Sequence, residues 1–200
     1  FGHMYVGCNL PDQDSTYGCN HSCNSDTDNC TGEIPPEIAE MSSLVEWRGF
    51  KNGISGPPTP HIKGLNNLEK FVMGWNNMDE PIPPEIGNEC FADSHLELQQ
   101  HCPPNDSNNL PQLKQLILNN NDIPHLLPKQ LAYLPNLTSL NLDYNQLTGE
   151  IPPQFGEMKK ITDISISHNQ LQGPLPREFY NLIGGVSPAE CDMIENYTPI

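Results

Sequence analysis

Seven cysteines are the residues of this 200-residue chain with the most distinctive chemistry. They can pair as disulfides in an oxidising compartment or, as thiolates, hold a zinc ion. The N-terminal cysteines lack the paired C-x-x-C spacing of structural zinc sites, so the pattern favours disulfides. The expected disulfide cysteines are Cys8, Cys19, Cys23, Cys30, Cys90 and Cys102.

The sequence leaves the pairing of the four N-terminal cysteines open, because four cysteines allow three connectivities. Cys90 and Cys102 most simply pair with each other, closing a loop of about 13 residues worth roughly 3 kcal/mol on chain-entropy grounds. Cys191 is then left over. It can be a free thiol, half of an intermolecular bridge, or a buried thiol packed as a small apolar residue.

Residues that could support catalysis are sparse. No nucleophile elbow, H-E-x-x-H helix, phosphate loop or dinucleotide fingerprint occurs. Asp143 beside Tyr144 could act as a glycosidase acid, but the pattern places no second carboxylate opposite it. His95 and His101 would not share one face of a short helix, so they predict no metal site. We expect no enzymatic activity, no metal and no cofactor.

Five N-x-[ST] sequons predict a glycoprotein that is secreted to the cell wall or extracellular matrix. They begin at Asn20, Asn29, Asn105, Asn136 and Asn196. No apolar run approaches about 18 residues, so we expect no membrane insertion. The N-terminus lacks the pattern of a signal peptide, and we expect the sequence to be a mature or trimmed form.

The formal charge of −16, from 9 basic and 25 acidic residues, opposes binding to nucleic acid or to an anionic membrane. It favours a cationic partner, or it serves only to keep an extracellular protein soluble.

A repeat of 24 residues must position these groups. From Leu137 to Phe155 four leucines stand around Asn145, and the segment closes with a glycine and two prolines. The same offsets return 24 residues later, and an insertion of 21 residues separates the third copy from the fourth. The six copies are centred on Asp28, Asn52, Asn76, Asn121, Asn145 and Asn169.

Each copy reads as one coil of a solenoid. The segment L-x-x-L-x-L ends in the alternation of a strand with one buried face, and the asparagine ends that strand by bonding the backbone of the turn. Glycine and prolines prevent a regular helix in the second half. The pattern predicts an α/β repeat solenoid with a parallel concave sheet and short 3-10 or polyproline convex segments. Predicted core residues are Leu116, Leu118, Leu140, Leu142, Ile164 and Ile166.

The pattern L-T-G-E-I-P at 147–152, with its copies, resembles the plant-type subclass of extracellular leucine-rich repeats. The resemblance implies a right-handed superhelix that binds a protein, peptide or glycan on its concave face. Two positions depart from it: Gly49 replaces a large apolar residue, and Asp28 replaces a ladder asparagine. We expect a cysteine-containing cap at 1–19, six repeats over 20–182 with the insertion at about 89–109, and a C-terminal cap or linker at 183–200.

Side chains just before each ladder residue should point out of the concave face. Aromatic and charged types mix at these offsets, as on surfaces used for recognition. The candidate ligand-binding residues are Arg48, Phe50, Lys51, Trp75, Asn120, Asp143, Tyr144 and His168.

Two functions fit these observations. The first is a secreted, non-enzymatic recognition module for a protein, peptide or glycan. The alternative is an extracellular structural subunit that assembles head-to-tail with copies of itself into filaments or matrix, because a solenoid with a poorly capped end can continue across a subunit boundary.

Overall fold

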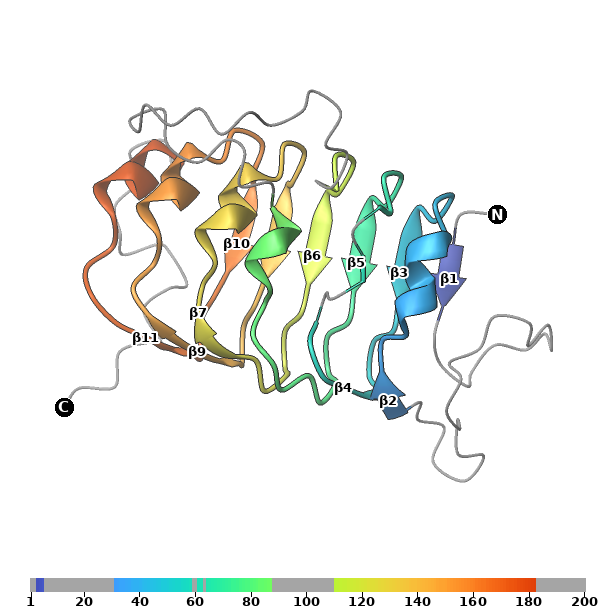
Figure 1. Cartoon of the computed structure of the whole chain (residues 1–200). Helices are drawn as coiled ribbons and strands as arrows, with labels where there is room; N and C mark the ends of the chain where they lie inside the picture. Colours follow the sequence, from blue (N-terminus) through green and yellow to red (C-terminus); the bar gives the residue numbers. More distant parts are fainter. Residues whose placement is uncertain (1–2, 6–30, 59–60, 63, 88–109, 183–200) are drawn as a thin grey trace, which may run out of the picture.

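The computed structural model describes residues 3–5, 31–58, 61–62, 64–87 and 110–182, which form a solenoid of stacked coils (Figure 1). Each coil contributes short strands, and 3-10 turns recur along the chain. All seven cysteines, the insertion, the C-terminal segment and every sequon except that of Asn136 lie outside the described residues. What the sequence predicts for those segments stays a prediction.

A parallel sheet of six strands runs along the solenoid. In spatial order its strands are β1 (His3–Tyr5), β3 (Glu46–Arg48), β5 (Lys70–Val72), β6 (Gln115–Ile117), β8 (Ser139–Asn141) and β10 (Asp163–Ser165). Phe71 lies opposite Leu116, which lies opposite Leu140. The insertion between β5 and β6 therefore leaves the repeat in register, and the predicted parallel sheet is confirmed.

The first strand of this sheet comes from the predicted cap. β1 pairs with β3, with Met4 opposite Trp47. The predicted cap over residues 1–19 thus contributes a strand to the main sheet, which the repeat pattern did not predict. An edge strand offers unpaired N–H and C=O groups, and β1 satisfies those of β3 through backbone bonds. His-Met-Tyr carries no leucine pattern that could have revealed this pairing.

The rest of each coil uses two smaller parallel sheets and 3-10 turns. In one sheet β2 (Thr31–Glu33) pairs with β4 (Gly53–Ser55); the other joins β7 (Pro124–Leu126), β9 (Gln146–Gly149) and β11 (Gln170–Leu171). The 3-10 turns are η1 (Pro36–Glu40), η2 (Pro84–Ile86), η4 (Lys129–Tyr133), η5 (Pro153–Glu157) and η6 (Arg177–Asn181). A proline begins three of them, where its missing N–H costs nothing. Figure 1 shows the turns in front of the six-stranded sheet, as the glycine and proline pattern predicts.

The hydrophobic core lies between the sheet and the turns. Five of the six predicted core residues are fully buried: Leu116, Leu118, Leu140, Leu142 and Ile166. The sixth, Ile164, is only partly buried. It belongs to β10, the last strand of the sheet, which has a neighbouring strand on one side only among the described residues.

A ladder of asparagines ties each coil to the preceding one. Asn145 Nδ2 donates to the carbonyls of Leu142 and Leu118, each at 3.0 Å. Its Oδ1 accepts the N–H of Ile123 at 3.1 Å. The same three types of bond recur at Asn76, Asn121 and Asn169. The predicted role of the asparagine is confirmed at these positions.

The departure at Gly49 is compensated by the next coil. A Cβ built on Gly49 would lie 2.5 Å from Sδ of Met73, the equivalent residue one coil further on. Met73 is fully buried, and its flexible thioether fills the space that a large apolar side chain would otherwise take.

The glycine of L-T-G-x-I-P is required for two reasons: its backbone conformation is one that side chains disfavour, and there is no space for a Cβ atom. Gly149 has φ +76°, and a Cβ there would lie 2.3 Å from Cδ2 of Leu126 in the preceding coil. His125 takes the equivalent place in its own coil and keeps φ +69°. Because a side chain is disfavoured in this conformation, His125 is strained.

Candidate ligand-binding surface

The six-stranded sheet has one buried and one outward side. The central residues of β3, β5, β6 and β8 are buried: Trp47, Phe71, Leu116 and Leu140. Since successive side chains alternate along a strand, the flanking residues point the other way. We call this outward side the open face; it is the side that the sequence predicts to be concave.

Residues with a left-handed backbone conformation, one in each of five coils, add a further column of side chains to the open face. The residue just before each described ladder asparagine has φ between 52° and 59°. These residues are Lys51, Trp75, Asn120, Tyr144 and His168. The conformation is rare for bulky residues, and bonds between coils hold it, as where Trp75 N–H donates to Asn119 O at 2.8 Å. It breaks the strand alternation immediately before the asparagine turns inward.

The eight predicted ligand-binding residues lie in the columns of the open face but differ in exposure. Phe50, Trp75 and Tyr144 are 50%, 51% and 51% exposed, which is high for large hydrophobic side chains. The exposed polar members are Arg48, Lys51 and His168, and the half-buried ones are Asn120 and Asp143. Exposure thus agrees with the predicted offsets, whereas the role in binding stays a prediction.

Tyr144 and His168 form a stacked pair. Their ring centroids are 3.9 Å apart and their planes differ by 13°. Because the two residues hold equivalent positions in adjacent coils, their faces point along the solenoid and their edges point to solvent. Those edges carry a phenolic hydroxyl and imidazole nitrogens, so the pair presents hydrogen-bonding groups on a rigid aromatic body.

Polar side chains at the C-terminal part of the open face bond to one another. Asp143 Oδ1 accepts the N–H of Ser167 at 2.7 Å and its hydroxyl at 2.8 Å. In the same two coils Ser139 Oγ donates to Asp163 Oδ2 at 3.0 Å. Asp143 therefore helps to hold two coils together.

The predicted binding site omitted two apolar side chains of the open face. Val72 and Ile117 are half-buried, and their Cα atoms are partners in β5 and β6. They lie four residues before a ladder asparagine, the same repeat position as Arg48, which the predicted site includes. Their β-branched side chains at an outward position were the available signal, because strand positions that face water are usually polar.

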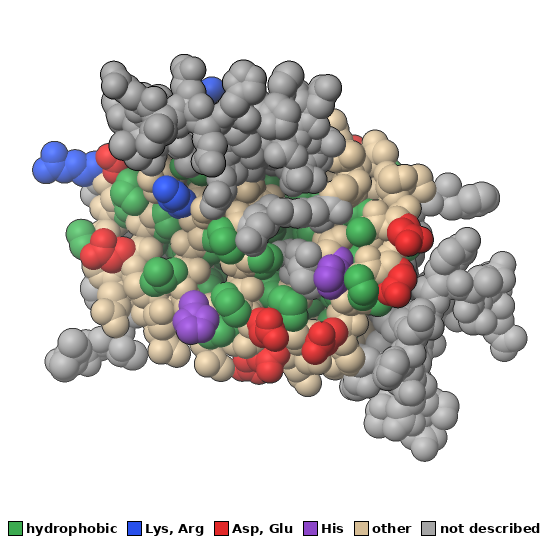
Figure 2. All heavy atoms as spheres, viewed as in Figure 1, with side chains coloured by type: hydrophobic (Ala, Val, Ile, Leu, Met, Phe, Trp, Pro, Cys, Tyr) green, Lys and Arg blue, Asp and Glu red, His purple; other side chains and the backbone are tan. Residues whose placement is uncertain are grey.

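Charge is unevenly distributed over the open face. Arg48 pairs with Glu46 in the same strand. Lys51 and Lys70 have no ion pair with any residue in the described ranges. On the side that carries the 3-10 turns, Figure 2 shows acidic side chains along the lower, right-hand and left-hand margins, whereas the few basic ones lie at the upper left. The open face of this strongly acidic chain thus carries two lysines that form no ion pair within the described part of the structure.

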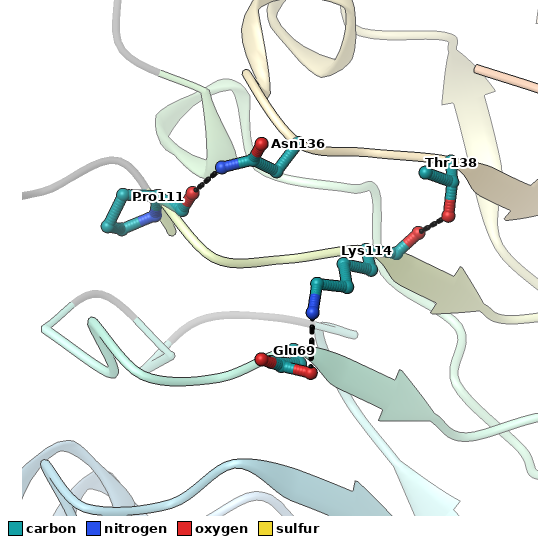
Figure 3. A network of polar contacts seen from close by, with 5 residues as sticks. All are labelled: Glu69, Pro111, Lys114, Asn136 and Thr138. Carbon is teal, nitrogen blue, oxygen red and sulfur yellow. Dashed lines mark hydrogen bonds and ion pairs between the residues drawn. The ribbon is translucent and has the colours of Figure 1, made fainter. Parts of the chain in front are cut away.

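The start of the strands carries a second set of polar contacts, drawn in Figure 3. Lys114 Nζ lies 2.9 Å from Glu69 Oε2, and Thr138 Oγ1 donates to Lys114 O at 3.0 Å. Asn136 Nδ2 donates to Pro111 O at 2.6 Å, and its Oδ1 accepts from Lys160. The amide of the one described sequon thus links its coil to both neighbours, and its glycosylation stays a prediction.

The described residues also bear on metal binding and on membrane insertion. No group of three or more His, Cys, Asp or Glu side chains in those ranges could hold a metal ion. None of the described helices is both long and apolar enough to cross a bilayer.

Comparisons with known proteins agree with this architecture. Two family profiles, both described as leucine rich repeat, match residues 101–147 and 160–182. No curated protein sequence matches the chain.

Solved structures extend the likeness to plant ectodomains. The ectodomain of the receptor kinase GASSHO1/SCHENGEN3 from Arabidopsis thaliana, in complex with CASPARIAN STRIP INTEGRITY FACTOR 2, is 27% identical with a TM-score of 0.62, over 76% of this chain and 16% of that one. A plant ice-binding protein is 32% identical with a TM-score of 0.59, over 76% and 43%. The ectodomain of the receptor kinase SOBIR1 from Arabidopsis thaliana is 25% identical with a TM-score of 0.58, over 75% and 70%. The chain thus spans less than half of the first two proteins.

Proposed function

From the premise that this chain is a leucine-rich-repeat protein with structural similarity to plant leucine-rich-repeat ectodomains, we propose that it is a recognition module. It binds a peptide, or an extended segment of a protein, on the open face of its six-stranded sheet. It acts outside the cell and catalyses no reaction.

The observation that carries this proposal is the set of exposed aromatic rings on a rigid surface. Phe50, Trp75 and Tyr144 each leave about half of the side chain in water. Aromatic side chains of this kind dominate binding energy when a partner covers them, and their few rotatable bonds make them inexpensive to immobilise. Their backbone is fixed by bonds between coils, so the surface is organised before a ligand arrives.

The similar structures support a peptide or protein ligand rather than a glycan. The GASSHO1/SCHENGEN3 ectodomain was crystallised with CASPARIAN STRIP INTEGRITY FACTOR 2, and PEPR1 was crystallised with AtPEP1. PEPR1 is 27% identical to this chain with a TM-score of 0.64. The stacked rings of Tyr144 and His168 add a local argument, because the pair combines an aromatic surface with polar groups of the kind that bond to a peptide backbone.

An extracellular location fits both the similar ectodomains and the predicted sequons and disulfides. Self-assembly into filaments is the competing proposal, and the partly buried Ile164 in the last strand favours it locally. Measuring the solution mass over a range of concentrations separates the two: a monodisperse monomer supports recognition, whereas growing multimers support assembly.

Selection from a random peptide library on the immobilised full-length chain tests the proposal. We expect enriched peptides to bind the unmodified protein and to lose binding when Trp75 and Tyr144 are both replaced by alanine. Leu126→Ala is the matched control, because Leu126 is 64% exposed in β7, outside the six-stranded sheet. Equal enrichment on the Trp75→Ala/Tyr144→Ala variant would show that the open face is not the binding surface.

A further inference from the structure

Within the proposed recognition function, we infer that the ligand segment is both apolar and acidic and that it docks over coils two to four. The surface it meets, here called the basic–apolar seat, consists of Lys51, Lys70, Val72, Trp75 and Ile117. This inference rests on the proposed function and adds the chemical class of the ligand and its place along the solenoid.

The apolar part of the seat lies on two neighbouring strands. Val72 and Ile117 are Cα partners, and both side chains are outward and half-buried. Trp75 follows Val72 in the left-handed column and is half exposed. In the next two coils the equivalent residues are Asn141 and Ser165, so the apolar strip ends at coil four. At the outward strand positions, a ligand can therefore bury apolar side chains over β5 and β6 but not over β8 or β10.

The cationic part of the seat flanks this strip. Lys70 precedes Val72 in β5, and Lys51 belongs to the coil before. Neither lysine has an ion pair with another described residue, whereas Arg48 is already paired with Glu46. Glu46, the Cα partner of Lys70, is itself paired with Arg48, so a carboxylate of the ligand would meet both ammonium groups without displacing an ion pair among the described residues. Such contacts fix which partner binds and in which register more than they raise affinity.

The remainder of the open face is unsuited to the same ligand. Asp143 bonds Ser167 and Asp163 bonds Ser139, so these polar groups already satisfy each other. Their carboxylates would also repel an acidic segment. The net charge of −16 would attract a basic ligand to many parts of the surface without fixing its position. Lys51 and Lys70, beside the apolar strip and without an ion pair among the described residues, thus favour an acidic segment at one place.

The dimensions of the seat set the length of the segment. From β3 to β6 there are two steps between adjacent strands, which at about 4.8 Å per step span roughly 10 Å. An extended peptide crossing the strands at about 3.4 Å per residue would place roughly three residues on the seat.

The experiment uses random-peptide selection on the full chain, followed by titration of enriched peptides. We expect the enriched sequences to combine Asp or Glu with large apolar residues within a window of about three residues. For such a peptide, the double variant Lys51→Glu/Lys70→Glu should weaken binding on the order of tenfold. Lys129→Glu/Lys159→Glu, with the same change in net charge at η4 and after η5, is the matched control and should change affinity less than about twofold.

Each outcome separates this inference from the proposed function. Enriched peptides that depend on Trp75 and Tyr144 but carry no acidic residue would overturn the acidic-segment inference and leave peptide recognition standing. Equal weakening by both charge-reversal variants would also overturn it, because the effect would then come from net charge alone. If no peptide is enriched over the Trp75→Ala/Tyr144→Ala variant, both proposals fail.

Discussion

The rings of Tyr144 and His168 stack with centroids 3.9 Å apart, although each residue holds the left-handed backbone conformation that bulky side chains usually avoid. Both features follow from one cause. The N–H of each of the first four residues in this column donates to a carbonyl of the next coil, as from Tyr144 to Ser167 O at 3.1 Å. The bonding that stacks the coils therefore also lines up the side chains just before the ladder.

The first prediction concerns the energy of this pair. In a double-mutant cycle with Tyr144→Ala and His168→Ala, urea unfolding should give a coupling of about 0.5 kcal/mol, at the low end for aromatic pairs because both rings are exposed. Tyr144→Ala with Lys51→Ala, three coils away in the same column, is the control cycle and should give no coupling. A zero value in both cycles would mean that the stack contributes nothing to stability in solution.

The asparagine ladder predicts that replacing an interior asparagine strongly lowers the free energy of unfolding. Asn145→Ala removes the partner of Ile123 N–H and of the carbonyls of Leu118 and Leu142, and should lower the free energy of unfolding by at least about 2 kcal/mol. Asn145→Asp should be as costly, because a carboxylate cannot donate to the carbonyls. Asn169→Ala should cost less, since Asn169 is only half-buried. Equal denaturation midpoints for Asn145→Ala and the unmodified chain would contradict this role.

The contact between Gly49 and Met73 predicts compensating substitutions. Gly49→Leu alone should destabilise by about 1 to 3 kcal/mol through overpacking against Met73. Met73→Ala alone should cost about 2 to 5 kcal/mol by leaving a cavity. Combined, the two changes should cost clearly less than their sum in thermal or urea unfolding. Strict additivity would show that the two positions do not share one space.

The strain at His125 predicts a stabilising substitution. His125→Gly should raise the free energy of unfolding by about 1 kcal/mol, because the residue has φ +69° and glycine adopts this conformation readily. His125→Ala is the control: it removes the same exposed imidazole but keeps a Cβ, so the urea midpoint should hardly move. If both variants shift the midpoint equally, the backbone conformation is not the cause.

The 24-residue repeat predicted most of the described architecture. The leucine offsets gave the buried residues of the sheet, such as Leu140, because alternation along a strand is a local property. The ladder asparagines were predictable for the same reason, since their bonds lie within a coil and to its neighbour. β1 was missed because its pairing depends only on backbone groups, which any sequence offers.

The candidate site was only partly predictable. Offsets before the ladder correctly gave the exposure of Trp75 and Tyr144. The bond of Asp143 to Ser167 depends on side-chain rotamers across two coils, which spacing does not specify. The left-handed conformation of the column was equally hidden, because Trp75 and Tyr144 are poor residues for it and no glycine marks the place.

Acrylamide quenching of tryptophan fluorescence tests the central claim, recognition on the open face, most directly. Trp47 is buried and Trp75 is 51% exposed, so quenching of the unliganded protein reports mainly Trp75. Saturation with a peptide whose binding is established independently by calorimetry should protect this tryptophan from acrylamide and shift its emission to shorter wavelength. Full binding with unchanged quenching and unchanged emission would contradict the account, because the ligand would then sit away from the aromatic side chains of the open face.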